Sequence, residues 1–260
     1  MLIRDNALPR PTSGVSTGFV QANLAIVPVD AADYFDEICQ RNSQALPLIE
    51  RLPPGTYSPL ISAQGADLRT DVGGYMAFDG SSWSYVPNLL KTWREDFVAF
   101  IIGCSFSAER ALKDAGVSLR HIALGTGVPI YRTNRPLTSA GELEGHLVVS
   151  MRAIRKDQVP AAEQATARYP LAHGAPVWVG PGREIDCHDG RDPDWGVELP
   201  VTSAETPMYW ACGVTPQTII EDSGIQGAIV HSPGHMFITD IPDRDIQDVS
   251  VEEWREKNGF

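Results

Sequence analysis

Two histidines in the segment HSPGHMFITD, His231 and His235, flank a Pro-Gly pair. Histidines one helical turn apart can bind zinc on a shared helix face, but proline and glycine break a helix between these two. Zinc would also require a third ligand from elsewhere in the chain. A turn that directs one imidazole into a cleft is the alternative, because neutral histidine transfers protons near pH 7. The pattern favours an acid–base site over a metal site, and a turn with incidental histidines is the third interpretation.

A carboxylate follows a sharp turn in the segment GCSFSAER. Gly103 permits the turn, Ser105 or Ser107 suits the N-terminal cap of a helix, and Glu109 falls in the first helical turn. Two interpretations stay open for Glu109. It is either an acid–base group at the base of a cleft or a carboxylate favoured there by the helix dipole.

Several groups could bind an anionic substrate. Arg132 and Arg152 leave apolar strands in VPIYRT and VVSMRAI, where a forked guanidinium can bind a carboxylate or pair with one of the many acidic side chains. In YWACGVTPQT, a helix is expected to begin at Thr215, and its free amides as far as Gln217 form either an anion site or an ordinary helix start. His173 precedes a strand, next to a glycine.

The elements that must position these residues alternate irregularly. Strands are expected at 23–29, 127–133, 146–154, 174–180 and 207–213, with a strand pair at 227–240. Helices are expected at 30–52 with a break before Pro47, across 88–116 with an interruption at Gly103, near 161–168 and from 215 to 224. This pattern predicts a mixed α/β fold, a single globular domain over 1–260 with a central mixed β-sheet flanked by helices. Residues 1–15 are expected as an extended arm and 243–260 as an acidic C-terminal tail.

The composition of the chain limits the binding partners and the cellular location that we expect for it. The formal charge of −12, from 21 basic and 33 acidic side chains, repels nucleic acid and anionic membranes, so neither is an expected partner. The 4 cysteines lie far apart without a CxxC pair, which argues against a zinc ribbon or a disulfide scaffold. No apolar run reaches the ~20 residues of a membrane helix. The N-terminal segment lacks the apolar core of a secretory signal, so a cytoplasmic location is expected.

A set of motifs follows a familiar order along the chain. They are GFVQANLAIVP, CQRN, ADLRTDV, FVAFIIGCSFSAE, RHIALGTGVPIYRTN, VVSMR, HGAPV, WACGVTPQ and HSPGHMFITD. Together they resemble the hydro-lyase family to which D-glutamate cyclase belongs, from about Thr12 to Ile241. The resemblance implies a lyase that converts D-glutamate to 5-oxo-D-proline and water, within 5-oxoproline metabolism.

The chain departs from the family pattern at a few positions. Ala108 stands where phenylalanine is usual, Ala153 replaces a proline, the run WVGPGREI lacks a histidine and an aspartate, and Val197 replaces an aspartate. These changes bear on the substrate, whereas Glu109 and the arginines and histidines named above are retained.

Cyclisation of glutamate requires a group that moves protons, a carboxylate anchor and stabilisation of a tetrahedral intermediate. The candidate catalytic residues are Glu109, His235 and His173, with Glu109 and His235 as the acid–base pair. The candidate substrate-binding residues are Arg152, Arg132, Ser105, His231, Thr215 and Gln217. No metal and no cofactor are expected, because the chain has no clustered cysteines and no dinucleotide fingerprint. The expected partner is a small acidic substrate, and self-association into a homo-oligomer is left open.

Two other functions compete with this reading. One is a metal-assisted dehydratase of a hydroxy acid, in which a metal holds the leaving hydroxyl. The other is a non-catalytic protein that binds a small acid in 5-oxoproline metabolism. Metal content would distinguish the first, and binding without turnover would distinguish the second.

Overall fold

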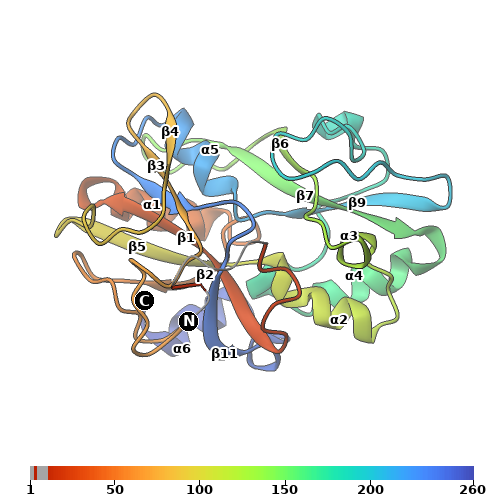
Figure 1. Cartoon of the computed structure of the whole chain (residues 1–260), viewed down its shortest axis with the longest axis horizontal. Coiled ribbons are helices and arrows are strands. Elements are labelled where there is room, and N and C mark those ends of the chain that lie inside the picture. The colour runs from red at the N-terminus through yellow and green to blue at the C-terminus, as the bar shows by residue number, and fades with distance from the viewer. Residues whose placement is uncertain (1–2, 5–10) are drawn as a thin grey trace.

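The computed structural model describes residues 3–4 and 11–260 (Figure 1). Its centre is β1 (Phe19–Pro28), which is buried along nearly its whole length. A strand covered on both faces can be continuously apolar, as in the run ANLAIV. β1 pairs along one edge with β5 (Phe97–Gly103) and along the other with both β10 (Ile229–His231) and β11 (Phe237–Pro242).

The strands form two sheets, and every strand pair is antiparallel. The seven-stranded sheet has the order β2 (Leu48–Arg51), β5, β1, β10, β3 (Tyr75–Phe78) and β4 (Trp83–Val86), with β11 also on β1. The four-stranded sheet has the order β6 (Ile130–Pro136), β7 (His146–Arg155), β9 (Glu205–Ala211) and β8 (Trp178–Val179). In Figure 1 the second sheet is green to cyan, and the first combines the red-to-yellow and blue ends of the chain.

Helices cover these sheets. They are α1 (Val29–Arg41), α2 (Glu109–Asp114), α3 (Arg120–Leu124), α4 (Val159–Ala167), α5 (Thr215–Asp222) and α6 (Val251–Asn258). Short 3-10 turns are η1 (Ser105–Ala108), η2 (Lys156–Gln158), η3 (Pro170–Ala172), η4 (Gly182–Ile185) and η5 (Asp243–Ile246). α2 and α4 share an apolar cluster with β7 and β9, whereas α1 and α5 pack in a cluster with β1 and β5. In the part of the chain that the structure describes, none of these helices is long and apolar enough to span a bilayer.

The mixed α/β class in one domain is confirmed, but the strands lie in two antiparallel sheets where one central mixed sheet was expected. Two helix predictions were also wrong. The segment FVAFIIG is the buried strand β5 and not part of a helix over 88–116, since it pairs with β1 and β2 on its two edges. The helix from residue 30 ends at Arg41, and the chain re-enters the sheet as β2.

The two ends of the chain pack against the domain. Within the expected arm, residues 1–2 and 5–10 lie outside the described residues, and 11–15 run beside the turn between β10 and β11. The expected acidic tail contains α6, which begins with a capping box at Ser250. Its Trp254 is buried, and the indole N–H donates to the carbonyl of Ile49 at 2.8 Å.

Candidate active site

A cavity of about 150 Å³ lies where the two sheets meet. Its lining comes from β1 and the β10–β11 turn of the first sheet, and from β6, β7 and the end of β9 in the second. On the edge of β1 that faces β10 and β11, strand pairing stops at Ala22 and resumes at Ala25, and the turn between β10 and β11 falls at this gap. The apolar lining includes Phe106, Val128, Ile130, Val197, Val214 and Met236. Four polar side chains also line it, namely Asn23, Ser105, Ser150 and His231.

Asn23 is held at the cavity wall by the end of β5. Its amide donates to the carbonyls of Gly103 at 2.6 Å and Ile102 at 3.3 Å. A Cβ on Gly213 would lie 1.8 Å from the Asn23 Cγ. The glycine of the ACGV motif is therefore required for the close approach of this amide.

The two serines of the cavity share one buried cation, Arg152. This guanidinium is 2% exposed and donates to the Ser105 and Ser150 hydroxyl oxygens, each at 3.2 Å. Its own atoms do not line the cavity. Since both hydroxyls accept from Arg152, each retains its hydrogen for a ligand. The site thus presents two polarised donors suited to a carboxylate or a developing oxyanion.

Glu109 lies behind this wall in a cluster with Arg152, His121 and Ser13. Its Oε1 is 3.0 Å from His121 Nε2 and 3.3 Å from the Arg152 guanidinium, and its Oε2 accepts from the Ser13 hydroxyl at 2.9 Å. Burial alone would raise the pKa of Glu109, but the hydrogen bond to His121 and the charge of Arg152 outweigh it and lower that pKa. Burial lowers the pKa of His121. The cluster therefore holds a carboxylate beside a neutral imidazole and a guanidinium.

His231 places a neutral imidazole at the cavity. Nδ1 lies 3.3 Å from both the N–H and the carbonyl oxygen of Leu24, and the buried Nε2 has no hydrogen-bond partner. Burial lowers the pKa of this side chain to about 4. Because Nδ1 faces the main chain, Nε2 is the nitrogen left for a ligand.

The structure does not join Glu109 directly to His235, the partner expected from the sequence. The His235 Nδ1 lies 3.2 Å from the carbonyl of Pro233, and its ring packs against Gly73, outside the cavity lining. His121 takes the position beside Glu109. In the sequence, the only indication of a role for His121 was its place in the motif RHIALG, shortly before β6. The acid–base role of His235 stays a prediction.

His173 is buried apart from the cavity. Its backbone has a φ of 71°, and Nδ1 lies 3.0 Å from the carbonyl of Gln44. Burial lowers its pKa to about 4, and Nε2 has no partner. Its catalytic role stays a prediction.

The remaining candidates for substrate binding already have partners in the protein. Arg132, on β6, pairs with Asp222 at 2.6 Å and Glu221 at 3.4 Å, the second of the two readings open for it. The amides of Thr215 and Gln217 donate to the carbonyls of Cys212 and Val214 at 3.0 and 2.9 Å. These two amides are therefore committed to the start of α5, and their contacts do not support the expected anion site.

No cluster of three histidine, cysteine or acidic side chains suited to a metal ion occurs within residues 3–4 and 11–260. Each of His231 and His235 makes its own main-chain contact instead. The observed hydrogen bonds thus give the two histidines separate environments.

Comparisons with known proteins place this chain in a family. A family model described as D-glutamate cyclase matches residues 98–240. A Geobacillus kaustophilus protein named "Putative hydro-lyase" is 42% identical over 94% of each chain, and a Nocardioides protein of the same name is 48% identical over 89% of this chain and 86% of its own. A nitrogen repressor-like protein from Methanococcus jannaschii aligns over 84% of each chain with a TM-score of 0.39 and 9% identity, too low to bear on function. Since the family model covers more than half of the chain and these relatives cover nearly all of it, the chain belongs to the D-glutamate cyclase family.

Proposed function

We propose that this protein is a hydro-lyase that removes water from a small carboxylic acid bound in the cavity between the sheets. The specific reaction we propose is cyclisation of D-glutamate to 5-oxo-D-proline. Family membership and the names of the relatives support the reaction class. The observation that carries the assignment to this cavity is that the pair of Arg152-backed hydroxyls lines the same cavity as His231, whose buried Nε2 has no hydrogen-bond partner.

The cavity's size fits a small metabolite. Its volume of about 150 Å³ is well below the roughly 300–1,000 Å³ of pockets for drug-sized ligands. The polar groups would meet the ends of a short acid, and the apolar wall would meet its methylene groups. A polymeric substrate does not fit such a space.

The chemistry balances with one proton carrier. With the substrate bound, its carboxylate charge raises the pKa of His231 above that of the free protein. The His231 Nε2 then takes a proton from the substrate ammonium, and the freed amine attacks the carbon of the side-chain carboxyl group. A C–N bond forms, a C–O bond breaks, and both protons lost by the nitrogen leave with the oxygen as water. Ser105 and Ser150 donate to the substrate oxygens, where negative charge develops in the tetrahedral intermediate. The tethered substrate supplies the proximity of the reacting atoms.

Conversion of D-glutamate, followed by proton NMR, tests this function. We expect the 5-oxoproline ring signals to appear with wild-type protein and to appear much more slowly with a Ser105→Ala, Ser150→Ala double variant. If neither D- nor L-glutamate nor a close analogue is consumed, the cyclisation proposal is wrong. Thermal melts of both proteins control for folding.

A further inference from the structure

The segment 11–15, called the strap here, runs beside the cavity from Pro11, which lines it, to the cluster around Glu109. Thr12 is fully buried, and its N–H and hydroxyl donate to the carbonyl of Gly234 at 2.8 and 3.2 Å. The same hydroxyl oxygen accepts from the N–H of Met236 at 3.1 Å. One threonine side chain thus fixes the turn that links His231 to β11. Pro11 itself lines the cavity.

The next residue of the strap reaches the other side of the site. The Ser13 hydroxyl donates to Oε2 of Glu109 at 2.9 Å, while His121 and Arg152 contact Oε1. Adjacent strap residues therefore contact the histidine-bearing turn and the carboxylate that holds Arg152. Those two groups come from parts of the chain more than a hundred residues apart.

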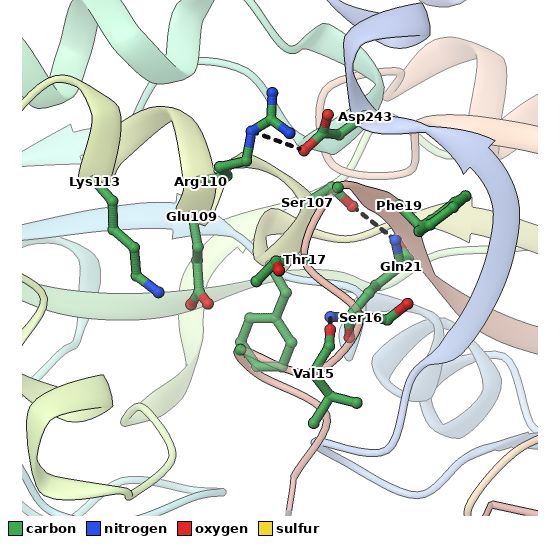
Figure 2. A pocket seen from close by; sticks show the side chains of 13 residues that line it. Val15, Ser16, Thr17, Phe19, Gln21, Ser107, Glu109, Arg110, Lys113 and Asp243 are labelled. Atoms are coloured by element: carbon green, nitrogen blue, oxygen red, sulfur yellow. Dashed lines mark hydrogen bonds and ion pairs between the residues drawn. The ribbon is translucent and has the colours of Figure 1, made fainter.

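Gln21 of β1 fastens the strap in this position. Its side-chain amide donates to the carbonyls of Thr12 at 3.0 Å and Val15 at 2.9 Å. Its backbone N–H donates to the Ser107 hydroxyl at 2.9 Å, which ties β1 to η1. Figure 2 shows Gln21 joined to Ser107, with Val15 and Ser16 drawn beside Gln21. These contacts hold the strap against β1, with Pro11 at the cavity.

We propose that Thr12 and Ser13 are positioning residues of the active site. Thr12 sets the turn that follows His231, and Ser13 sets the carboxylate of Glu109 and, through it, Arg152. The inference rests on the proposed function only where turnover is measured. Its structural part can be read without any substrate.

The charged groups around Glu109 determine how its pKa should respond when the Ser13 hydroxyl is removed. His121 on α3 and Arg152 on β7 contact its Oε1. Lys113, one turn along α2, lines together with Glu109 a second, smaller pocket, which Figure 2 shows. Arg110 turns away to Asp243 at 3.5 Å. Removing the Ser13 donor leaves the buried carboxylate less stabilised, so its pKa should rise.

The first experiment titrates the Glu109 carboxyl carbon by NMR, with the signal assigned from a Glu109→Gln variant. In Ser13→Ala the titration midpoint should move to higher pH, and in Ser13→Thr, which restores a hydroxyl, it should return toward wild type. An unchanged midpoint in Ser13→Ala would overturn the role of Ser13. Neither result depends on knowing the substrate.

The second experiment compares Thr12→Val with Thr12→Ser. Valine keeps the shape but loses the hydroxyl, so the His231 ring signals should shift and kcat should fall about tenfold or more with a smaller change in KM. Serine should restore both. Wild-type His231 signals and wild-type kcat in Thr12→Val would overturn the inference. If wild-type protein turns over no acid, the proposed function fails, while the ring signals still decide the role of the strap.

Discussion

His231 is bound so that either neutral tautomer is satisfied. The Leu24 N–H can donate to Nδ1, or Nδ1–H can donate to the Leu24 carbonyl, with both atoms at 3.3 Å. In the first case Nε2 is a donor and in the second an acceptor. A ring held in this way can take a proton from a substrate and return it without losing its support from the main chain.

We therefore expect His231→Gln to lower kcat by roughly 10²–10⁴-fold, the usual contribution of general acid–base catalysis, with little change in KM. His235→Gln is the companion variant from the same turn, and its kcat measures the acid–base role that the sequence predicted for His235. Steady-state kinetics of both variants show which of the two histidines carries the proton. A large loss in His235→Gln with none in His231→Gln would instead support the role expected for His235 from the sequence.

The Arg152 fork reaches two serines and Glu109 at once, which lysine cannot reproduce. We expect Arg152→Lys to lower kcat/KM by about ten- to a hundredfold, or roughly 1.4–2.7 kcal/mol of transition-state stabilisation. Arg132→Lys, in a pair outside the cavity lining, should have little effect on kcat/KM. Thermal melts establish that each variant is folded. Equal kinetics in the two variants would remove Arg152 from the site.

At the scale of elements, the local sequence pattern predicted several strands and helices close to their observed positions. β7, β9 and α5 lie close to where their apolar spacing and the proline near the helix start placed them. β5 was mistaken for helix because FVAFIIG is apolar throughout, and such a run has no period that distinguishes strand from buried helix. Its identity depends on β1 and β2, which lie far away in sequence.

Prediction of the site was limited in the same way, because contacts between distant segments cannot be read from a local pattern. The sequence indicated Glu109, Arg152, Ser105 and His231 as candidate groups, and the structure places them in or directly behind one wall. It did not indicate that His121 and Ser13 contact Glu109. Those contacts depend on how the arm and α3 fold back onto α2, which no spacing within a short segment records.

A substitution at Gly213 tests how closely the two sheets approach each other. A Cβ there would overlap the Asn23 side chain, with 1.8 Å to its Cγ, so Gly213→Ala should lower the free energy of unfolding by about 1–3 kcal/mol or more. Adding Asn23→Ala should recover part of that loss. Gly127→Ala is the control, since no heavy atom lies within 4 Å of its Cβ position. Urea denaturation measures wild type, Gly127→Ala, the two single variants Gly213→Ala and Asn23→Ala, and their double variant. Equal losses from Gly213→Ala with and without the Asn23 side chain would show that the overlap is not the cause.

At the scale of the whole molecule, buried neutral histidines should make stability depend on pH. Burial lowers the pKa of His173 and His231 from 6.5 to about 4. The unfolded chain therefore binds protons below pH 6.5, whereas the folded chain does not until about pH 4. Unfolding is favoured as pH falls through this window, by about 1.4 kcal/mol per pH unit for each histidine. The lowered pKa of Glu109 affects the free energy of unfolding only at lower pH, as the pH falls below the ordinary pKa of a glutamate.

Urea denaturation at pH 7 and pH 5.5 checks this expectation. Wild-type protein should lose about 2–3 kcal/mol from the two histidines between these pH values. His231→Gln, which cannot titrate, should lose roughly half as much. A His231→Gln variant with the full wild-type pH dependence would contradict the buried neutral state of this side chain.

The central claim is that water is lost from a small acid inside the cavity between the sheets. Val197 lines that cavity and is 41% exposed, so a large side chain can be introduced there without disturbing the core. The decisive measurement is the rate of water loss from a panel of amino and hydroxy acids, read by mass spectrometry for wild type and Val197→Trp. We expect wild-type protein to dehydrate D-glutamate, and Val197→Trp to do so at least about tenfold more slowly with an unchanged melting temperature. A panel left intact by wild-type protein, or a Val197→Trp variant as active as wild type, would contradict the claim.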